Sequence, residues 1–207
     1  ISNKTINGIV LDNSKKITCK SLVLTTGTFL NGLIRIGKKS FPAGRIGDKP
    51  SINLANKIKS LNFSNGRLKT GTPPRIEKLS INFNDLEEQK GDNVITPFSF
   101  INNHISTPQI SCFITHTNQN THSIINNNIH LSPMYSGEIK SMGTRYCPSI
   151  EDKVNKFLNK NSHQIFLEPE GLKSEIIYPN GISTSLPENI QYEFIQTIPG
   201  LENSKII

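Results

Sequence analysis

The residues around Cys147 favour a reactive cysteine over one that is buried for structural reasons. The cysteine belongs to the run Arg-Tyr-Cys-Pro at 145–148, and Ser149 then offers a typical helix N-cap followed by acidic residues at 151–152. A neighbouring cation and a helix N-terminus both stabilise a thiolate, which is the nucleophilic form of cysteine. A structural cysteine would more naturally lie inside a periodic apolar segment. We therefore interpret Cys147 as a candidate nucleophile.

Four cationic side chains close to glycines are candidates for contacting phosphate groups: Arg45, Arg67, Lys69 and Arg75. The chain carries a formal net charge of +7, which favours a polyanionic partner such as nucleic acid. Such cations would contact either the phosphates of a cofactor or those of an RNA backbone. The alternative is that they only form a solvated surface, as charged runs usually do.

Small residues follow a predicted strand at 22–24. Thr26 and Gly27 lie in the run Thr-Thr-Gly-Thr, where the backbone can turn tightly and approach a ligand. An ordinary turn between a strand and a loop explains the same pattern. Ser51 precedes apolar residues at helical spacing and is a plausible N-cap, at a helix start that suits a phosphate or a ribose. The alternative for Ser51 is a residue that merely caps its helix.

The composition is that of a folded chain. Its 207 residues are 34% hydrophobic and 19% charged, which allows one large domain or two small ones. No apolar run approaches the ~20 residues that span a bilayer, and no secretory leader is visible, so we expect no membrane association and a cytoplasmic location. The three cysteines lack CxxC spacing and the five histidines lack HxxxH or HExxH spacing, so we expect neither a disulfide framework nor a metal site.

The hydrophobic pattern predicts both strands and helices. The predicted strands form a hairpin with its turn at 12–16 and then lie at 22–24, 110–117, 164–167 and 176–178. The predicted helices begin at Ser51 and Ser149 and also span about 84–90, 121–130 and 187–197. The helix after Ser149 is expected to bury Val154, Phe157 and Leu158. Residues 206–207 look like the beginning of a further strand.

Six segments, taken in order, resemble one known family: 68–75 (LKTGTPPR), 115–118 (THTN), 132–135 (SPMY), 145–153 (RYCPSIEDK), 167–171 (LEPEG) and 178–186 (YPNGISTSL). They are similar to the MnmG, or GidA, family of tRNA-modifying enzymes. The resemblance implies an α/β fold, part of a two-dinucleotide-binding (FAD/NAD, Rossmann-like) fold with an inserted α+β lobe. Residues 1–72 would then be part of the FAD-binding domain, 73–197 the inserted NAD-binding and substrate lobe, and 198–207 the return strand to the FAD domain.

The resemblance also implies which residues serve the cofactors. Thr26 and Gly27 match a strand end that passes near the flavin nucleotide, and Ser51 matches a family contact to FAD. The stretch assigned to NAD in the family matches Gly143, Thr144, Arg145, Tyr146, Cys147, Pro148, Ser149, Ile150, Glu151, Asp152, Lys153, Val154, Asn155, Lys156 and Phe157. Cys147 itself matches one of two cysteines thought to serve the chemistry.

The family implies FAD and NADH as cofactors and methylenetetrahydrofolate as the one-carbon donor. Its activity adds an aminomethyl or carboxymethylaminomethyl group at C5 of the wobble uridine of tRNA, together with the GTPase MnmE, and the enzyme is expected to be a homodimer within a heterotetramer. The family's glycine-rich pyrophosphate loop, companion cysteine and C-terminal helical domain have no counterpart in these 207 residues. We therefore expect the chain by itself to be inactive and to hold no flavin tightly.

Two other interpretations compete with this one. A folate- and FAD-dependent tRNA uracil methyltransferase is similar in its flavin domain, but we know no reason to expect RYCPSIEDK-like and YPNGISTS-like segments in it. A cofactor-free RNA-binding module would explain the positive charge and the missing nucleotide loop. That module would leave the paired flavin-type and NAD-type segments unexplained.

Overall fold

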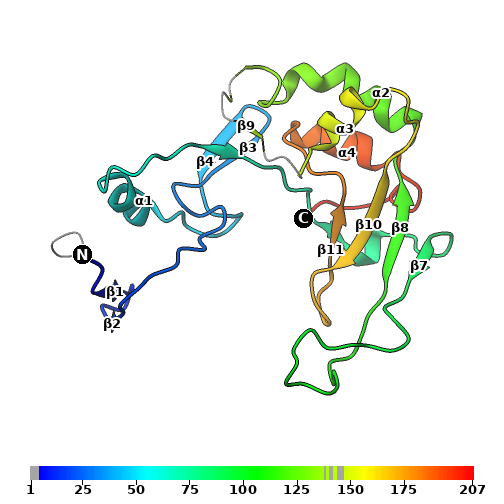
Figure 1. Ribbon diagram of the computed structural model, residues 1–207. Helices are drawn as coiled ribbons and strands as arrows, with labels where there is room; N and C mark the ends of the chain where they lie inside the picture. The colour runs from blue at the N-terminus through cyan, green and yellow to red at the C-terminus, as the bar shows by residue number, and fades with distance from the viewer. Residues whose placement is uncertain (1–4, 138, 140–141, 144–146) are drawn as a thin grey trace. The chain divides into compact units, whose positions relative to one another are not determined.

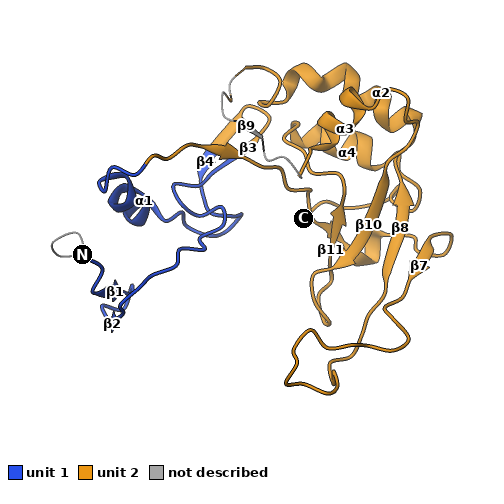
Figure 2. Cartoon of the chain, viewed as in Figure 1, with its two compact units in different colours: residues 1–34, 41–63 blue, residues 35–40, 64–207 orange. Residues whose placement is uncertain are grey.

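The computed structural model describes residues 5–137, 139, 142–143 and 147–207, with residues 142–143 described by their backbone alone. The chain forms two compact units, which Figure 2 colours separately. The first unit comprises residues 1–34 and 41–63, and the second comprises residues 35–40 and 64–207. The main division therefore falls at 63–64, whereas the sequence predicts a boundary at 72.

The first unit contains the hairpin that the sequence predicts. Its strands β1 (Gly8–Val10) and β2 (Lys16–Thr18) pair antiparallel, with Ile9 opposite Ile17. The turn between them includes Ser14, whose positive φ of 63° lies in the left-handed region. Local turn chemistry and alternation are sufficient to place this hairpin.

The predicted buried strand at 22–24 is wrong. Residues 22–24 form no strand, and Val23 is 82% exposed. A strand needs a neighbouring strand to satisfy its backbone N–H and C=O groups, and none of the described residues pairs with this segment. The run is apolar, but apolar character alone does not supply the missing partner.

Helix α1 (Ile52–Lys59) begins directly after Ser51, as the sequence predicts. The side chain of Ser51 makes no capping hydrogen bond, and no residue of α1 is buried. The start of the helix is fixed by backbone contacts instead, because Ser51 N donates to Phe29 O at 2.8 Å. The Phe29 ring in turn occupies the space beside Gly44, where any side chain would meet it.

Strands β3 (Leu33–Ile36) and β4 (Lys39–Pro42) form a second hairpin. Its tip, residues 35–40, belongs to the second unit. Gly37 N donates to Ser185 O at 2.8 Å, and Gly37 has a φ of +52°. A Cβ at Gly37 would lie 2.8 Å from Cγ of Pro187, so this close approach requires glycine.

The second unit is built on a five-stranded antiparallel sheet in the order β6-β11-β10-β8-β7 (Figure 1). The strands are β6 (Ile76–Glu77), β7 (Glu87–Gln89), β8 (Cys112–His116), β10 (Gln164–Pro169) and β11 (Ile176–Asn180). The central strand β10 places Gln164 opposite His116 of β8 and Phe166 opposite Asn180 of β11. The strands predicted at 110–117, 164–167 and 176–178 are thereby confirmed.

Three helices and two short 3-10 turns complete the second unit, with a separate parallel pair of strands. They are α2 (Gln119–Asn128), α3 (Ile150–Lys156), α4 (Glu188–Ile195), η1 (Lys78–Ser80), η2 (Ile129–Leu131), β5 (Leu68–Lys69) and β9 (Met142–Gly143). The helices predicted at 121–130, after Ser149 and at 187–197 are confirmed. Within the described part of the chain, no helix has both the length and the apolar character needed to cross a membrane.

One apolar core holds the second unit together, with side chains from the sheet and all three helices. Among its members, Leu167 of β10, Ile125 of α2, Val154 of α3 and Phe194 of α4 are each buried. Full burial of such a side chain contributes about 1.5–3 kcal/mol relative to exposure. The core therefore holds α3 in place within the second unit.

The buried face predicted for α3 is partly wrong. Val154 is buried as expected, but Phe157 and Leu158 are 54% and 76% exposed. Helix α3 ends at Lys156, and Phe157 leaves the helical region with φ −113° and ψ 57°. The helical periodicity that would carry Phe157 and Leu158 toward the core stops before it reaches them.

The helix predicted at about 84–90 is also wrong, because residues 87–89 form the edge strand β7. Glu87 pairs with Ile114 of β8, and Gln89 pairs with Cys112. The segment has no apolar periodicity that would favour a strand over a helix. Its conformation is set by the free edge of β8, which lies more than twenty residues away in the sequence.

Residues 198–207 belong to the second unit in this structure, whereas the sequence analysis assigns them to a strand of the first domain. Ile198 and Leu201 are fully buried in the core of the second unit. Ile206 forms an antiparallel bridge with Ile76, and Ile207 N donates to Arg75 O at 3.0 Å. These side chains are thus part of the core of the second unit, and the assignment of residues 198–207 to the FAD-binding domain stays a prediction.

Candidate active site

Cys147 is exposed and lies directly before the start of α3. Ser149 caps this helix as the sequence predicts, and the cap is reciprocal. Asp152 N donates to Ser149 Oγ at 3.1 Å, while Ser149 N donates to Asp152 Oδ2 at 3.3 Å. Residues 144–146, which include the predicted cation Arg145, lie outside the described part of the chain.

Lys153, which belongs to the predicted NAD segment, is a half-buried cation in α3. Its Nζ donates to Gly181 O at 2.8 Å. Burial lowers the pKa of Lys153 below its ordinary value, while the charge of a nearby Cys147 thiolate opposes this effect. The hydrogen bond to Gly181 O holds the ammonium group of Lys153 at the loop that follows β11.

Glu151 is the most unusual residue of this segment, because its carboxyl group is completely buried. Its Oε1 accepts hydrogen bonds from Ser132 Oγ, Thr184 Oγ1 and Ser185 N, each at 3.1 Å. Its Oε2 is also buried and has no partner among the described residues. Burial raises the pKa of Glu151, although the hydrogen bonds to Oε1 oppose that shift.

The surroundings of Asp152 lower its pKa, whereas those of Glu151 raise it. Tyr135 Oη donates to Asp152 Oδ1 at 3.0 Å, and Lys156 Nζ lies 3.0 Å from the same oxygen. Burial alone would raise the pKa of Asp152, but hydrogen bonds from Lys156, Tyr135 and Ser149 hold it below its ordinary value. Burial and the Asp152 carboxylate together raise the pKa of Tyr135.

The predicted NAD segment divides into an interior side and a surface side. The side chains of Ser149, Ile150, Glu151 and Val154 are buried and serve the fold. Cys147, Pro148, Asn155, Lys156 and Phe157 are exposed, and Asp152 and Lys153 are half-buried. Gly143 lies in β9, and Thr144, Arg145 and Tyr146 lie outside the described residues. Among the described residues of this segment, the exposed and half-buried side chains are the ones that can reach a cofactor.

The predicted flavin residues lie in the first unit. Thr26 O accepts a hydrogen bond from Phe29 N at 3.1 Å, which closes a tight turn around Gly27. Gly27 has a φ of +53°, and a Cβ placed on it would meet no atom within 4 Å. The turn is therefore open on the side where a ligand could approach the backbone. Ser51 lies at the start of α1, with its hydroxyl not used as a cap.

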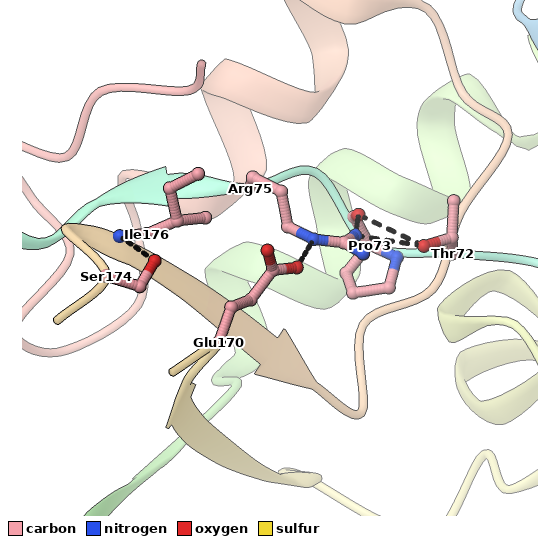
Figure 3. Close-up of polar contacts among 6 residues, drawn as sticks. All are labelled: Thr72, Pro73, Arg75, Glu170, Ser174 and Ile176. Carbon is pink, nitrogen blue, oxygen red and sulfur yellow. Dashed lines mark hydrogen bonds and ion pairs between the residues drawn. The ribbon is translucent and has the colours of Figure 1, made fainter. Parts of the chain in front are cut away.

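Arg75 is held within the protein by several contacts, which Figure 3 shows. Its Nε pairs with Glu170, and its Nη1 donates to Thr72 Oγ1 at 3.1 Å and to Pro73 O at 2.8 Å. The guanidinium also lies 4.4 Å from the centre of the Tyr178 ring. Arg75 therefore has several internal partners, and its contact with a phosphate stays a prediction.

The other predicted phosphate contacts differ from one another. Arg45 is exposed and forms an ion pair with Asp48 in the first unit. Arg67 is exposed, and Lys69 is half-buried in β5. No three His, Cys, Asp or Glu side chains among the described residues are grouped in a way that could hold a metal ion.

Sequence reasoning misses the polar contacts around Glu151, because it treats the acid only as a favourable charge in the first turn of a helix. The signal that could have revealed these contacts is the concentration of hydroxyl groups in the run Ser-Thr-Ser at 183–185, inside an otherwise apolar segment. Hydroxyls at buried positions need partners, and a buried acid in turn needs donors.

Taken together, the chain combines an α/β fold with an exposed cysteine held at the start of a helix. The family model for glucose inhibited division protein A (GidA) matches residues 1–207. The chain belongs to this family, which confirms the resemblance seen in the six sequence segments.

Relatives and solved structures agree with this assignment. The chain is 53% identical over 207 residues to the tRNA uridine 5-carboxymethylaminomethyl modification enzyme MnmG of Thermodesulfovibrio yellowstonii, and 51% identical over 206 residues to the enzyme of the same name from Granulibacter bethesdensis. Each match covers 100% of this chain and 33% of the relative. The chain therefore spans about a third of the length of these relatives, whose names are those of enzymes that modify tRNA.

Two crystal forms of Aquifex aeolicus GidA have the same fold over the whole chain. The form I structure matches with a TM-score of 0.83 at 45% identity, covering 100% of this chain and 36% of that one. The form II structure matches with a TM-score of 0.82 at 43% identity, covering 100% of this chain and 34% of that one. The predicted fold class, an α/β part of a two-dinucleotide-binding protein, is thereby confirmed.

Proposed function

We propose that this chain is part of an enzyme that modifies the wobble uridine of tRNA at C5, adding an aminomethyl or carboxymethylaminomethyl group. The observation that carries the proposal is the exposed Cys147 at the capped start of α3, within a chain that is 51–53% identical to enzymes named for this modification. The cofactors of the proposal are FAD and NADH, with methylenetetrahydrofolate as the carbon donor. The proposed partner is the GTPase MnmE, and the enzyme is proposed to act as a homodimer in the cytoplasm.

The first unit fits the role of a flavin-binding segment. The open turn at Gly27 lets a nucleotide approach the backbone closely, and Thr26 borders that turn. Ser51 offers a hydroxyl at a helix start, where unpaired N–H groups attract phosphate or ribose oxygens. In this proposal, residues 1–72 are part of the FAD-binding domain.

The surface side of the NAD segment fits the second cofactor. Asn155, Lys156 and Phe157 offer an amide, a cation and an aromatic ring within three exposed positions. These groups are suited to polar contacts, a phosphate and a stacked ring, respectively. When bound, the two cofactors would supply the reducing equivalents of the reaction.

Cys147 is the proposed nucleophile of the site. A thiolate that adds to C6 of uracil makes C5 nucleophilic, so that C5 can take up a one-carbon unit. The exposure of Cys147 permits such an approach. A wobble base must leave its anticodon stack to reach the sulfur. Arg45, Arg67 and Lys69 are proposed to contact phosphates of the tRNA or of a cofactor.

The test replaces Cys147 by serine in the full-length protein, with the equivalent replacement of Cys19 as the matched control. Nucleosides from tRNA treated with each protein, both cofactors, methylenetetrahydrofolate and MnmE are analysed by mass spectrometry. We expect Cys147→Ser to reduce modification to background, while Cys19→Ser retains it. Full modification by the Cys147 variant would exclude the proposed role of this thiol.

A further inference from the structure

Three successive residues tie the first turn of α3 to two distant segments. Ile150 N donates to Ser183 O at 2.7 Å, and Asp152 accepts the hydroxyl of Tyr135 at 3.0 Å. Between them, Glu151 accepts hydrogen bonds from Ser132 and from residues 184–185. The SPMY and YPNGISTSL segments, which are remote from Cys147 in the sequence, therefore converge on the helix that follows it.

The contacts at Glu151 are concentrated on a single atom. All three donors point to Oε1, whereas Oε2 is buried without a described partner. Ser132 Oγ also lies 2.9 Å from Ser185 Oγ, so the donors are connected to one another. A buried network of this kind has a defined geometry, because each donor restricts the position of the same acceptor.

We propose that Glu151 is a positioning residue, which fixes the location of the Cys147 thiol by anchoring the first turn of α3 to Ser132 and to residues 184–185. The proposal rests on the proposed function of Cys147 as the reactive thiol. Cys147 is exposed, so its position depends on the backbone that follows it rather than on packing of its own side chain. Glu151 lies four residues after Cys147, in the first turn of α3, and its carboxyl group is fully buried.

A fully structural explanation of Glu151 predicts a loss of stability and nothing more. The positioning role predicts in addition that Cys147 loses reactivity in variants that still fold. Displacement of a reacting group by about 1 Å can cost roughly a hundredfold in rate. Removal of one donor should displace the turn by less, so we expect a loss of roughly tenfold.

The decisive variant is Thr184→Val, which removes one hydroxyl donor to Oε1 and keeps the shape of the side chain. The matched control is Thr115→Val, because Thr115 is also buried and its hydroxyl donates at 2.8 Å to Pro199 O instead of to Glu151. Glu151→Ala and Glu151→Gln form the second pair. Glutamine keeps an Oε1 acceptor for all three donors, whereas alanine removes it.

The experiment measures two properties of each variant in the full-length protein. The first is the rate at which iodoacetamide alkylates Cys147 across a range of pH, with every other cysteine replaced by serine. The second is the rate of tRNA modification with the native cysteines present. We expect Thr184→Val to lower the rate of tRNA modification roughly tenfold, because that reaction depends on the position of the sulfur relative to the bound base. Alkylation by a free reagent depends on the exposure and the protonation of the thiol, and we expect Thr184→Val to change its rate and its pH profile. We expect Thr115→Val to match the parent protein in both assays.

The variants Glu151→Ala and Glu151→Gln test whether an acceptor at position 151 is enough to keep Cys147 in place. Glu151→Ala should lose modification at least as severely as Thr184→Val, and Glu151→Gln should recover most of that loss. If Glu151→Ala fails to fold, Thr184→Val still decides the question. Equal effects of Thr184→Val and Thr115→Val, or an unchanged alkylation profile in Thr184→Val, would overturn the positioning role.

Failure of the proposed function would look different from failure of this inference. If Cys147→Ser retained modification, the thiol would not serve the reaction. The alkylation profiles would nevertheless report whether Thr184 and Glu151 fix the position of Cys147. Altered profiles would then support positioning, and parent-like profiles would refute it.

Discussion

Replacement of Arg75 by alanine separates a structural role from a phosphate contact, because the two roles predict opposite results. The ion pair with Glu170 joins side chains that are 33% and 36% exposed, so solvent screens it in part. Exposed pairs contribute about 0.2–1 kcal/mol, a hydrogen bond from a charged donor such as that to Pro73 O about 1.5–3 kcal/mol, and an exposed cation–π contact about 0.5–1 kcal/mol. These contributions overlap and solvent screens them in part, so we expect Arg75→Ala to reduce the free energy of unfolding by about 1–3 kcal/mol.

The assay is urea unfolding of the full-length protein, followed at the transition of the second unit. A stability loss of this size should lower the urea midpoint while the slope m stays constant. Glu170→Gln provides a double-mutant cycle with a coupling energy of about 0.5–1 kcal/mol. The salt dependence of tRNA binding should not change. An unchanged midpoint, together with a log–log salt slope that flattens by about one unit, would refute the structural role and restore the phosphate contact.

The residues around Cys147 allow three more tests. Gly181→Ala should destabilise the protein by about 1–3 kcal/mol in urea unfolding, because its φ is +117° and the new Cβ would lie 2.7 Å from Gln164 O; an unaffected midpoint would contradict this. The pKa of Glu151 is raised, so the folded state binds the proton of this carboxyl group more tightly than the unfolded state does. The resulting stabilisation is present below the ordinary pKa of 4.5 and is lost as the pH rises through the raised pKa. Glu151→Gln should remove that part of the pH dependence of the melting temperature. Lys153→Met should lower the free energy of unfolding by about 1–2 kcal/mol, because it removes the hydrogen bond from Lys153 Nζ to Gly181 O at 2.8 Å; an unchanged urea midpoint would contradict this.

Local signals in the amino-acid sequence are enough to identify the family and several of the elements. Ser149 and Asp152 lie three residues apart, so their spacing alone indicates a capping box. The hairpin of β1 and β2 and the strands β8, β10 and β11 follow from alternation and turn residues. These features depend on residues within a few positions of one another.

Features whose partners are distant in the sequence depend on the tertiary fold. The donors to Glu151 come from positions 19, 33 and 34 residues away, and the acid that pairs with Arg75 is 95 residues away. A local sequence pattern contains no information about partners so far along the chain. In the sequence, therefore, a buried acid looks the same as a surface acid, and an arginine with internal partners looks the same as one that contacts phosphate. Likewise β7 is a strand because the edge of β8 offers unpaired backbone groups, whereas residues 22–24 have no such neighbour among the described residues. Burial and pairing are properties of the folded chain, and they override local preference wherever the two disagree.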